Sequence, residues 1–210
     1  GIQADLKTFA AHGVHGLSAI AALTAQHTRG VTAVHVPPAE FLRAQIDACF
    51  DDFRIGAVKL GMLATAEIIH AVAEAPAYWR PPQLVLDPVM VATSGAKLLE
   101  DAALDALRTR LIPMATLVTP NLPEAELLLG HRIAGDDAAE AALDALTALG
   151  ASAVLLKGGH LPGARMIDRL AAGGTRARFT HARLDVEGHG TGCTLAAAVA
   201  AELLLGHALP

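Results

Sequence analysis

A glycine-rich stretch near the end of the chain has the composition of an anion-binding loop. Residues 188–194 read GHGTGCT, and an alanine-rich apolar run follows directly. Glycines allow a ligand to approach the backbone closely, and the start of a helix adds partial positive charge. We therefore expect Thr191 and the amides of Gly190, Gly192 and Cys193 to form an anion hole. The stretch lacks the lysine of a Walker A loop and the sequence context of a dinucleotide-binding fingerprint.

Cys193 would lie in the first turn of the helix that follows this loop. The helix dipole favours the thiolate form of a cysteine in that position, so the sulfur could serve as a base. The alternative is a small buried hydrophobic residue, which is what most free cysteines are. His189 is a second candidate base, or simply a loop residue between two glycines. The other cysteine, Cys49, fits the core side of an amphipathic helix over 41–53.

Polar residues follow three apolar runs that are typical of buried strands. Asp87 comes after LVL, Asn121 after LVTP, and Lys157 after AVLL. In open α/β sheets ligands bind beyond the carboxyl ends of the strands, so we expect these residues to share one site. Glu124 follows Asn121 at the spacing of an ordinary capping box. It could instead hold a water of a hydrated Mg²⁺, with Asp87 as a second residue near the metal. Lys157 could neutralise a phosphate.

The elements that must position these residues alternate between strands and helices. This alternation predicts a three-layer α/β/α fold with a mostly parallel central sheet. The predicted strands cover 31–36, 56–63, 83–90, 115–121 and 152–160, and helices are predicted at 65–75, 99–112, 122–130 and 137–150. Residues 16–28 fit either a strand or a helix. Residues 176–186 alternate in polarity and predict an edge hairpin.

The composition is that of a single globular domain over residues 1–210. Hydrophobic residues make up 53% and charged residues 18% of the chain, and the formal net charge is −5. There is no long basic run, so nucleic-acid binding is not supported. No apolar stretch approaches the length of a membrane span. Two distant cysteines that match no metal-binding spacing favour a reducing cytoplasm over a disulfide scaffold.

Taken together, these motifs make the chain resemble the hydroxymethylpyrimidine/phosphomethylpyrimidine kinases of thiamine synthesis, which are ribokinase-like enzymes. The matching stretches follow the family order over nearly the whole chain: GIQADLKTFAAHGVHG, ALTAQHT, KLGML, LDPVM, LVTPNLPEAELLLG, LLKGGH and HGTGCTLAAAVA. Cys193 makes the match specific, because the wider ribokinase-like family usually has Asp there. The family normally also has an opening strand before GIQADLK and helices after LLLG, so we expect both to be absent from this chain.

The resemblance implies an activity and a substrate pocket. It implies ATP-dependent phosphorylation of the hydroxymethyl group of 4-amino-5-hydroxymethyl-2-methylpyrimidine, and then of its monophosphate. Gln26 would hydrogen-bond the aminopyrimidine, while Met62 and Val89 would pack against its ring. Cys193 would take the position of the base. The implied enzyme is a cytoplasmic homodimer with small-molecule ligands only.

The resemblance also implies a nucleotide site. Asn121 and Glu124 would organise Mg²⁺ and the ATP phosphates, with Asp87 and Lys157 nearby. Three other functions stay open at this point. A pyridoxal kinase of the same family also phosphorylates a hydroxymethyl group on a flat heteroaromatic ring. The chain could also be a non-catalytic vitamin- or nucleotide-binding module, or a redox sensor built on Cys193, for which no nearby resolving cysteine is present.

Overall fold

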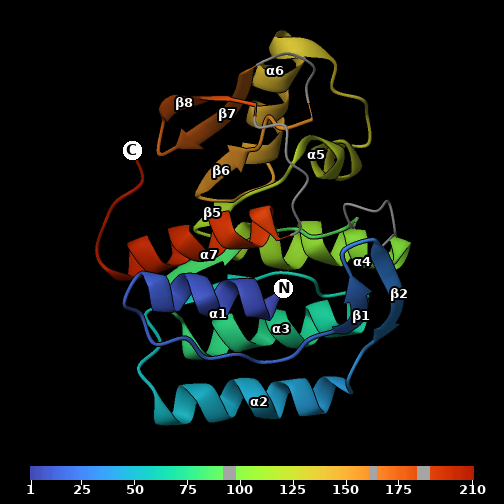
Figure 1. Ribbon diagram of the computed structural model, residues 1–210, viewed down its shortest axis with the longest axis vertical. Helices are drawn as coiled ribbons and strands as arrows, with labels where there is room; N and C mark the ends of the chain where they lie inside the picture. The colour runs from blue at the N-terminus through green and yellow to red at the C-terminus, as the bar shows by residue number, and fades with distance from the viewer. Residues whose placement is uncertain (92–97, 161–164, 184–189) are drawn as a thin grey trace.

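A mixed six-stranded sheet forms the centre of the molecule, in the order β3-β4-β5-β6-β7-β8 (Figure 1). The computed structural model describes residues 1–91, 98–160, 165–183 and 190–210. The strands are β3 (Ala57–Leu60), β4 (Gln83–Leu86), β5 (Leu117–Val118), β6 (Ala153–Leu156), β7 (Arg165–Ala172) and β8 (Thr175–Ala182). Strands β3 to β6 are parallel to one another, whereas β7 and β8 are antiparallel to their neighbours. The predicted mostly parallel sheet is confirmed.

Helices cover both faces of this sheet (Figure 1). They are α1 (Ile2–Ala11), α2 (Ala39–Asp52), α3 (Ala66–Trp79), α4 (Asp101–Ala106), α5 (Leu122–Leu129), α6 (Gly135–Thr147) and α7 (Thr191–Leu204). Helix α7 packs on β3 and β4 with α1 beside it, and α2 packs on α3. After α4 the chain continues through a π-helical turn, η1 (Leu107–Leu111), and a 3₁₀ turn, η2 (Ile112–Met114). In the described part of the chain, no helix has the length and hydropathy needed to cross a bilayer.

Alternate side chains of each parallel strand enter two different hydrophobic cores. Leu84 and Leu86 of β4 belong to the large core that also contains residues of α3, α4 and α6. Val85, between them, belongs to the smaller core with Ala196 and Ala200 of α7. Burial on both faces explains why these strands appear in the sequence as continuous apolar runs. Each fully buried side chain of this size contributes roughly 1.5–3 kcal/mol, so hydrophobic packing holds the parallel half of the sheet.

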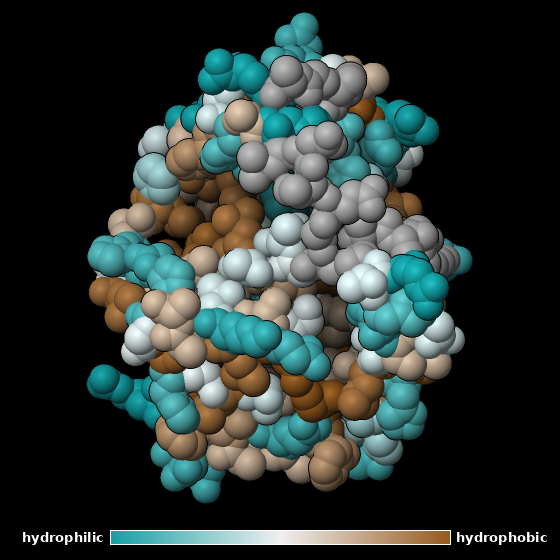
Figure 2. All heavy atoms as spheres, viewed as in Figure 1, coloured by the Kyte–Doolittle hydropathy of each residue, from teal (hydrophilic) through white to brown (hydrophobic). Residues whose placement is uncertain are grey.

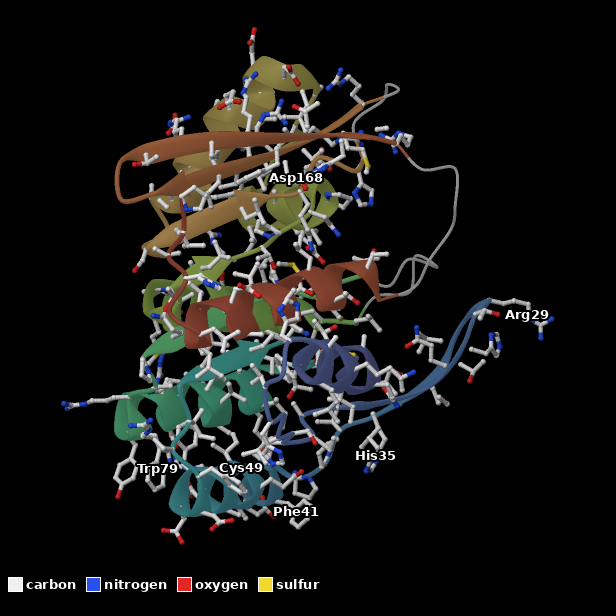
Figure 3. The ribbon with its side chains drawn as sticks, turned by 60° about the vertical axis from the view of Figure 1, so that its left-hand side comes forward. Arg29, His35, Phe41, Cys49, Trp79 and Asp168 are labelled. Atoms are coloured by element: carbon white, nitrogen blue, oxygen red, sulfur yellow. The ribbon has the colours of Figure 1, made fainter. Side chains whose placement is uncertain are left out.

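A small hairpin projects from the side of the molecule, away from the main sheet (Figures 1 and 3). Its strands are β1 (Leu23–His27) and β2 (Gly30–His35), which pair antiparallel. Arg29 lies at its tip (Figure 3). The sequence fits either a strand or a helix over residues 16–28. In the structure the last part of this range is strand β1. The predicted strand at 31–36 is confirmed as β2.

The predicted edge hairpin is only half correct. Strand β8 overlaps the predicted range 176–186, but its partner is β7, which comes before it in the sequence. The chain turns at Gly173 and Gly174, whose φ angles are +53° and +83°. Such angles favour glycine in a tight hairpin turn. Strand β7 was missed because it reads RMIDRLAA, with charged residues inside it. Residues 184–186 of the prediction, and Gly188 and His189, lie outside the described residues.

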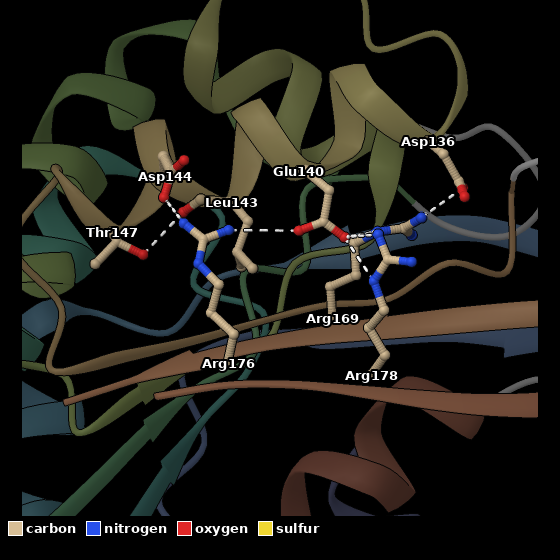
Figure 4. A network of polar contacts seen from close by, with 8 residues as sticks. All are labelled: Asp136, Glu140, Leu143, Asp144, Thr147, Arg169, Arg176 and Arg178. Atoms are coloured by element: carbon tan, nitrogen blue, oxygen red, sulfur yellow. Dashed lines mark hydrogen bonds and ion pairs between the residues drawn. The ribbon is translucent and has the colours of Figure 1, made fainter. Parts of the chain in front are cut away.

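Charged side chains hold the β7–β8 hairpin against α6 (Figure 4). This ion-pair network consists of Arg169, Arg176 and Arg178 from the hairpin and Asp136, Glu140 and Asp144 from α6. The Arg169 side chain is only 1% exposed, and its Nε lies 2.9 Å from Glu140 Oε1. Burial raises the pKa of Glu140, but hydrogen bonds from Arg178 and Arg169 outweigh it, and the net pKa lies below the ordinary value. A carboxylate at this position is therefore ionised at neutral pH.

Candidate active site

A large cavity opens at the carboxyl ends of the parallel strands. Its volume is about 1110 Å³, and its wall includes all the residues assigned to a site from the sequence that the structure describes. Figure 2 shows the molecule hollowed near the centre of one face, with apolar residues inside the hollow. The part near Asp87 and Lys157 is polar, whereas residues of α1, α2 and β3 line a mainly apolar part. The cavity thus brings a charged end and an apolar end into one space.

A buried ion pair forms the charged end of the cavity. Asp87 follows β4 and Lys157 follows β6, and the Lys157 Nζ lies 3.1 Å from Asp87 Oδ1. The Thr119 hydroxyl donates a second hydrogen bond, also of 3.1 Å, to the same oxygen. Asp87 has an exposed side-chain fraction of 3% and Lys157 of 15%. Two charges can remain buried here because they are paired and hydrogen-bonded. The lysine ammonium still has donors to offer a ligand.

The Asn121–Glu124 pair forms the capping box that the sequence allowed. The Asn121 Oδ1 accepts from the Glu124 backbone N–H at 2.9 Å, and Glu124 Oε2 accepts from the Asn121 N–H at 2.8 Å. Glu124 is nevertheless buried beside the charged end of the cavity. Burial raises its pKa to about 7, although the Lys157 charge and the Asn121 N–H act in the opposite direction. Capping does not exclude a ligand role, because Glu124 also lines the cavity.

The glycine-rich loop brings the start of α7 against the buried ion pair. Gly190 is the N-cap of α7 and has a φ of +84°, a left-handed conformation that favours glycine. A Cβ at Gly192 would lie 3.1 Å from Lys157 Nζ and 3.7 Å from Asp87 Oδ2. Glycine therefore permits a closer approach than any other residue would. The first amides of a helix have no partner within it, and at α7 they lie beside a lysine ammonium.

Cys193 occupies the third position of α7 and is half-buried. It lines the cavity, and its Sγ lies 3.3 Å from the amino nitrogen of Gly1. The sulfur is thus accessible from the cavity. Cys49 was expected to be in the core, but it is also half-buried and lines the apolar part of the cavity. That prediction was wrong because the helix face bearing Cys49 borders a space and is not packed on all sides.

The three residues assigned to the pyrimidine come from separate elements. Gln26 is on β1, and its Oε1 accepts a 3.2 Å hydrogen bond from the Thr24 hydroxyl. Met62 follows β3 and Val89 follows β4, and both are half-buried. All three line the same cavity, and Gln26 is exposed to solvent.

Two features at or next to the cavity wall were missed in the sequence. Thr119 orients Asp87, and its signal was its position directly before Pro120 at the end of an apolar strand. Lys59 of β3 forms a buried ion pair with Asp5 of α1, with an Nζ–Oδ1 distance of 3.0 Å. A lone lysine inside an apolar strand needs a buried partner, and this requirement could have indicated the pair.

The acidic residues of the site suit a partly hydrated magnesium ion. In residues 1–91, 98–160, 165–183 and 190–210, no group of three or more His, Cys, Asp or Glu side chains could enclose a metal. Asp87 and Glu124 supply only hard carboxylate oxygens. Mg²⁺ usually binds through one or two carboxylates and keeps its other positions for water and substrate phosphates. The two residues therefore fit Mg²⁺ bound together with a nucleotide.

Comparisons with known proteins agree with this geometry. The family model for phosphomethylpyrimidine kinase matches residues 1–210. The hydroxymethylpyrimidine/phosphomethylpyrimidine kinase of Rhizobium meliloti (strain 1021) is 51% identical over 208 residues, which are 98% of this chain and 78% of that protein. The crystal structure of phosphomethylpyrimidine kinase from Clostridium difficile 630 is 41% identical, with a TM-score of 0.87 and coverage of 100% of this chain and 86% of that one.

A pyridoxal kinase has a similar fold at lower identity. The Staphylococcus aureus enzyme, in complex with AMP-PCP and pyridoxal, is 32% identical, with a TM-score of 0.89 and coverage of 99% of this chain and 76% of that one. The ribokinase-like fold is thereby confirmed. The family model covers the whole chain, and the identity to the Rhizobium meliloti relative is well above that to the pyridoxal kinase. The chain belongs to the phosphomethylpyrimidine kinase family.

Proposed function

We propose that the protein transfers a phosphoryl group from ATP to the hydroxymethyl group of 4-amino-5-hydroxymethyl-2-methylpyrimidine, and then to the resulting monophosphate, in thiamine biosynthesis. The family and the names of its relatives support this substrate. The structural observation that carries the proposal is the approach of α7 to the buried ion pair. Because Gly192 has no side chain, the start of α7 comes close to the Lys157 ammonium, which supports a role for both in binding one phosphate.

The charged end of the cavity would stabilise the negative charge that develops on the phosphoryl group during transfer. Phosphoryl transfer depends mainly on positioning and electrostatic stabilisation. The amides of Gly190, Gly192 and Cys193 would face the transferred phosphoryl group, together with the Thr191 hydroxyl and amide. Lys157 would bind the ATP phosphates, while Asn121, Glu124 and Asp87 would organise the nucleotide side. Mg²⁺, when bound at Glu124 through water and near Asp87, would neutralise phosphate charge.

Cys193 would serve the accepting alcohol. In the transfer, the hydroxymethyl oxygen forms a bond to the terminal phosphorus of ATP, and the bond from that phosphorus to the bridging oxygen breaks. The electron pair of the broken bond leaves with ADP. The hydroxyl proton would pass to Cys193 as the thiolate, and the resulting thiol would return the proton to water after ADP leaves. Gln26 would bind the aminopyrimidine by hydrogen bonds, with Met62 and Val89 against the ring faces. Replacing Gln26 with Ala should raise the KM for the pyrimidine and leave the KM for ATP nearly unchanged.

A coupled ADP-release assay tests the function directly. With Mg²⁺ and ATP present, the pyrimidine and then its monophosphate should each release ADP, at higher kcat/KM than pyridoxal. Preference for pyridoxal would move the protein to the related activity that its similarity to the Staphylococcus aureus enzyme suggests. Calorimetric binding of the pyrimidine without ADP release would instead indicate a non-catalytic binding module.

The proposed assembly is a homodimer. Large apolar side chains are exposed on the β1–β2 hairpin and on α2: Leu23 is 48%, Val34 44% and Phe41 60% exposed. Association of two chains could remove such apolar groups from water. Light scattering during gel filtration should give twice the chain mass of 21.6 kDa. The monomer mass would contradict this assignment.

A further inference from the structure

The loop that carries Lys157 is fastened on both sides. On one side the Lys157 backbone N–H donates to the Pro120 carbonyl at 2.9 Å, and Lys157 bridges to Asn121. On the other side the Gly158 N–H donates to Asp168 Oδ1 at 2.8 Å. Successive N–H groups of an extended chain point in opposite directions, so each neighbouring element receives one. Asp168, on β7, is labelled in Figure 3.

The Asp168 carboxylate serves as a hydrogen-bond acceptor at the point where backbone pairing between β6 and β7 ends. The last pair of the ladder is Leu156 with Arg169. Continued pairing would bring Gly158 opposite Ile167. A Cβ at Gly158 would overlap the Ile167 carbonyl, so the loop lies directly on β7. The loop departs from the ladder there, and the Asp168 carboxylate, not a backbone carbonyl, accepts the buried Gly158 N–H.

We infer that Asp168 is a positioning residue for the nucleotide site, an inference that rests on the proposed function. Its carboxylate holds Gly158, and Gly158 is covalently next to the lysine whose Nζ lies 3.1 Å from Asp87. A hydrogen bond to a charged acceptor is stronger than a neutral one, and an orphaned buried N–H is costly. Loss of the carboxylate would therefore release one side of the loop and misplace the Lys157 ammonium. Nothing in the described contacts joins Asp168 to the residues assigned to the pyrimidine.

Asp168→Ala should therefore act on the nucleotide side of the reaction. We expect the KM for ATP to rise about tenfold or more, since one buried hydrogen bond of this kind corresponds to about that factor. The KM for the pyrimidine should stay within about twofold. Asp168→Asn should restore most of the loss, because its amide oxygen can accept the same N–H.

Two control variants separate positioning from general loosening of the hairpin. His181 Nε2 lies 3.4 Å from the other Asp168 oxygen, and Arg178 anchors the hairpin to α6. His181→Ala removes a neighbour of Asp168, and Arg178→Ala removes an anchor of the hairpin, and neither removes the acceptor of Gly158. Both should keep the KM for ATP within about twofold. A rise in either variant equal to that of Asp168→Ala would overturn the inference, as would failure of Asp168→Asn to restore the KM.

A measurement on the unaltered protein keeps the inference testable if Asp168→Ala does not fold. Amide hydrogen exchange by NMR should find the Gly158 N–H strongly protected, in the absence of any substrate. An unprotected Gly158 amide would refute the inference whatever the enzyme phosphorylates. Conversely, a protected amide in a protein that does not phosphorylate the pyrimidine would refute the proposed function and leave the positioning of the loop intact.

Discussion

The Asp87–Lys157 pair and the ion-pair network of the β7–β8 hairpin differ in their surroundings and in their roles. The Asp87–Lys157 pair lies at the wall of the cavity between elements held by apolar packing. The ion-pair network of α6 and the β7–β8 hairpin lies away from the cavity, and most of its members are partly exposed (Figure 4). Charges at the wall of a cavity are available to a ligand. Charges paired between α6 and the β7–β8 hairpin hold these elements together.

The comparison predicts that changes at the two clusters affect different measurements. Replacements at the cavity should change kinetics with little effect on stability. Replacements in the network should change stability with little effect on kinetics. Four experiments test whether kinetic and stability effects separate in this way.

The largest effect should follow from Lys157→Gln. Glutamine keeps an N–H donor for Asp87 but removes the positive charge that would meet phosphate. We expect kcat/KM to fall by about 10²–10³-fold, the range found when one donor of a transition-state anion site is removed. Steady-state assays and thermal unfolding should be run on the same preparation. A large fall in Tm with only a small loss of kcat/KM would show that the Asp87–Lys157 pair acts mainly on stability. That result would contradict the division between the two clusters.

Cys193→Ala should have the next largest effect. Removing a general base typically lowers kcat by about 10²-fold or more. Since Cys193 is half-buried at the cavity wall, the loss of its sulfur should change Tm only slightly. Single-turnover rates with the pyrimidine provide the measurement. If kcat stays within a few-fold of the parent protein, Cys193 is an orienting or packing residue.

Arg169→Ala should destabilise the fold by about 2 kcal/mol, since breaking a buried pair costs less when the remaining carboxylates keep other partners. Glu140 retains Arg178, and Asp136 is partly exposed. Denaturant unfolding measures the change, and Arg169→Met is the matched variant because it keeps the aliphatic volume. The KM values should be unchanged in both variants. A selective rise in the KM for ATP would show that this network extends to the catalytic site.

The smallest effect should come from acidification. The folded-state pKa of Glu140 lies below the ordinary 4.5, so its contribution to stability is fully present above about pH 4.5 and is lost as the pH falls through the folded value. Exchange of hairpin amides should therefore accelerate at acid pH before that of β4 amides. Arg178→Ala should reduce this difference and should itself cost less than about 1 kcal/mol, in a salt-dependent manner. Simultaneous opening of both regions would contradict the comparison.

The parallel half of the sheet was predictable because its strands are buried on both faces. Runs such as Leu84 to Leu86 then appear as unbroken apolar sequence, bounded by the polar residues that topology places at one edge. That rule placed Asp87, Asn121 and Lys157 together. The hairpin was not predictable in the same way. Arg169 is buried inside β7 only because its partners come from a helix about 30 residues earlier, and no local pattern shows such a pairing.

The site was predictable to the extent that its residues end strands or begin helices. Gly192 beside Lys157 required the tertiary structure, since the two are separated by the whole hairpin. Thr119 and the Lys59–Asp5 pair depend on which elements become neighbours in space. The role of Asp168 likewise depends on where the β6–β7 ladder ends.

The inner side of α7 consists of buried alanines: Ala196, Ala197, Ala200 and Ala201. On this side α7 contributes only methyl groups to its contact with the sheet, where Ala196 and Ala200 pack with Val85, Leu117 and Leu155. Ala200 lies about 12 Å along the helix axis from Gly192, at 1.5 Å per residue. A longer side chain at Ala200 would push α7 away from the sheet. The start of the helix, with Gly192, would then move away from Lys157. The tolerance of the enzyme to substitution is thus set partly by the packing of α7 on the sheet.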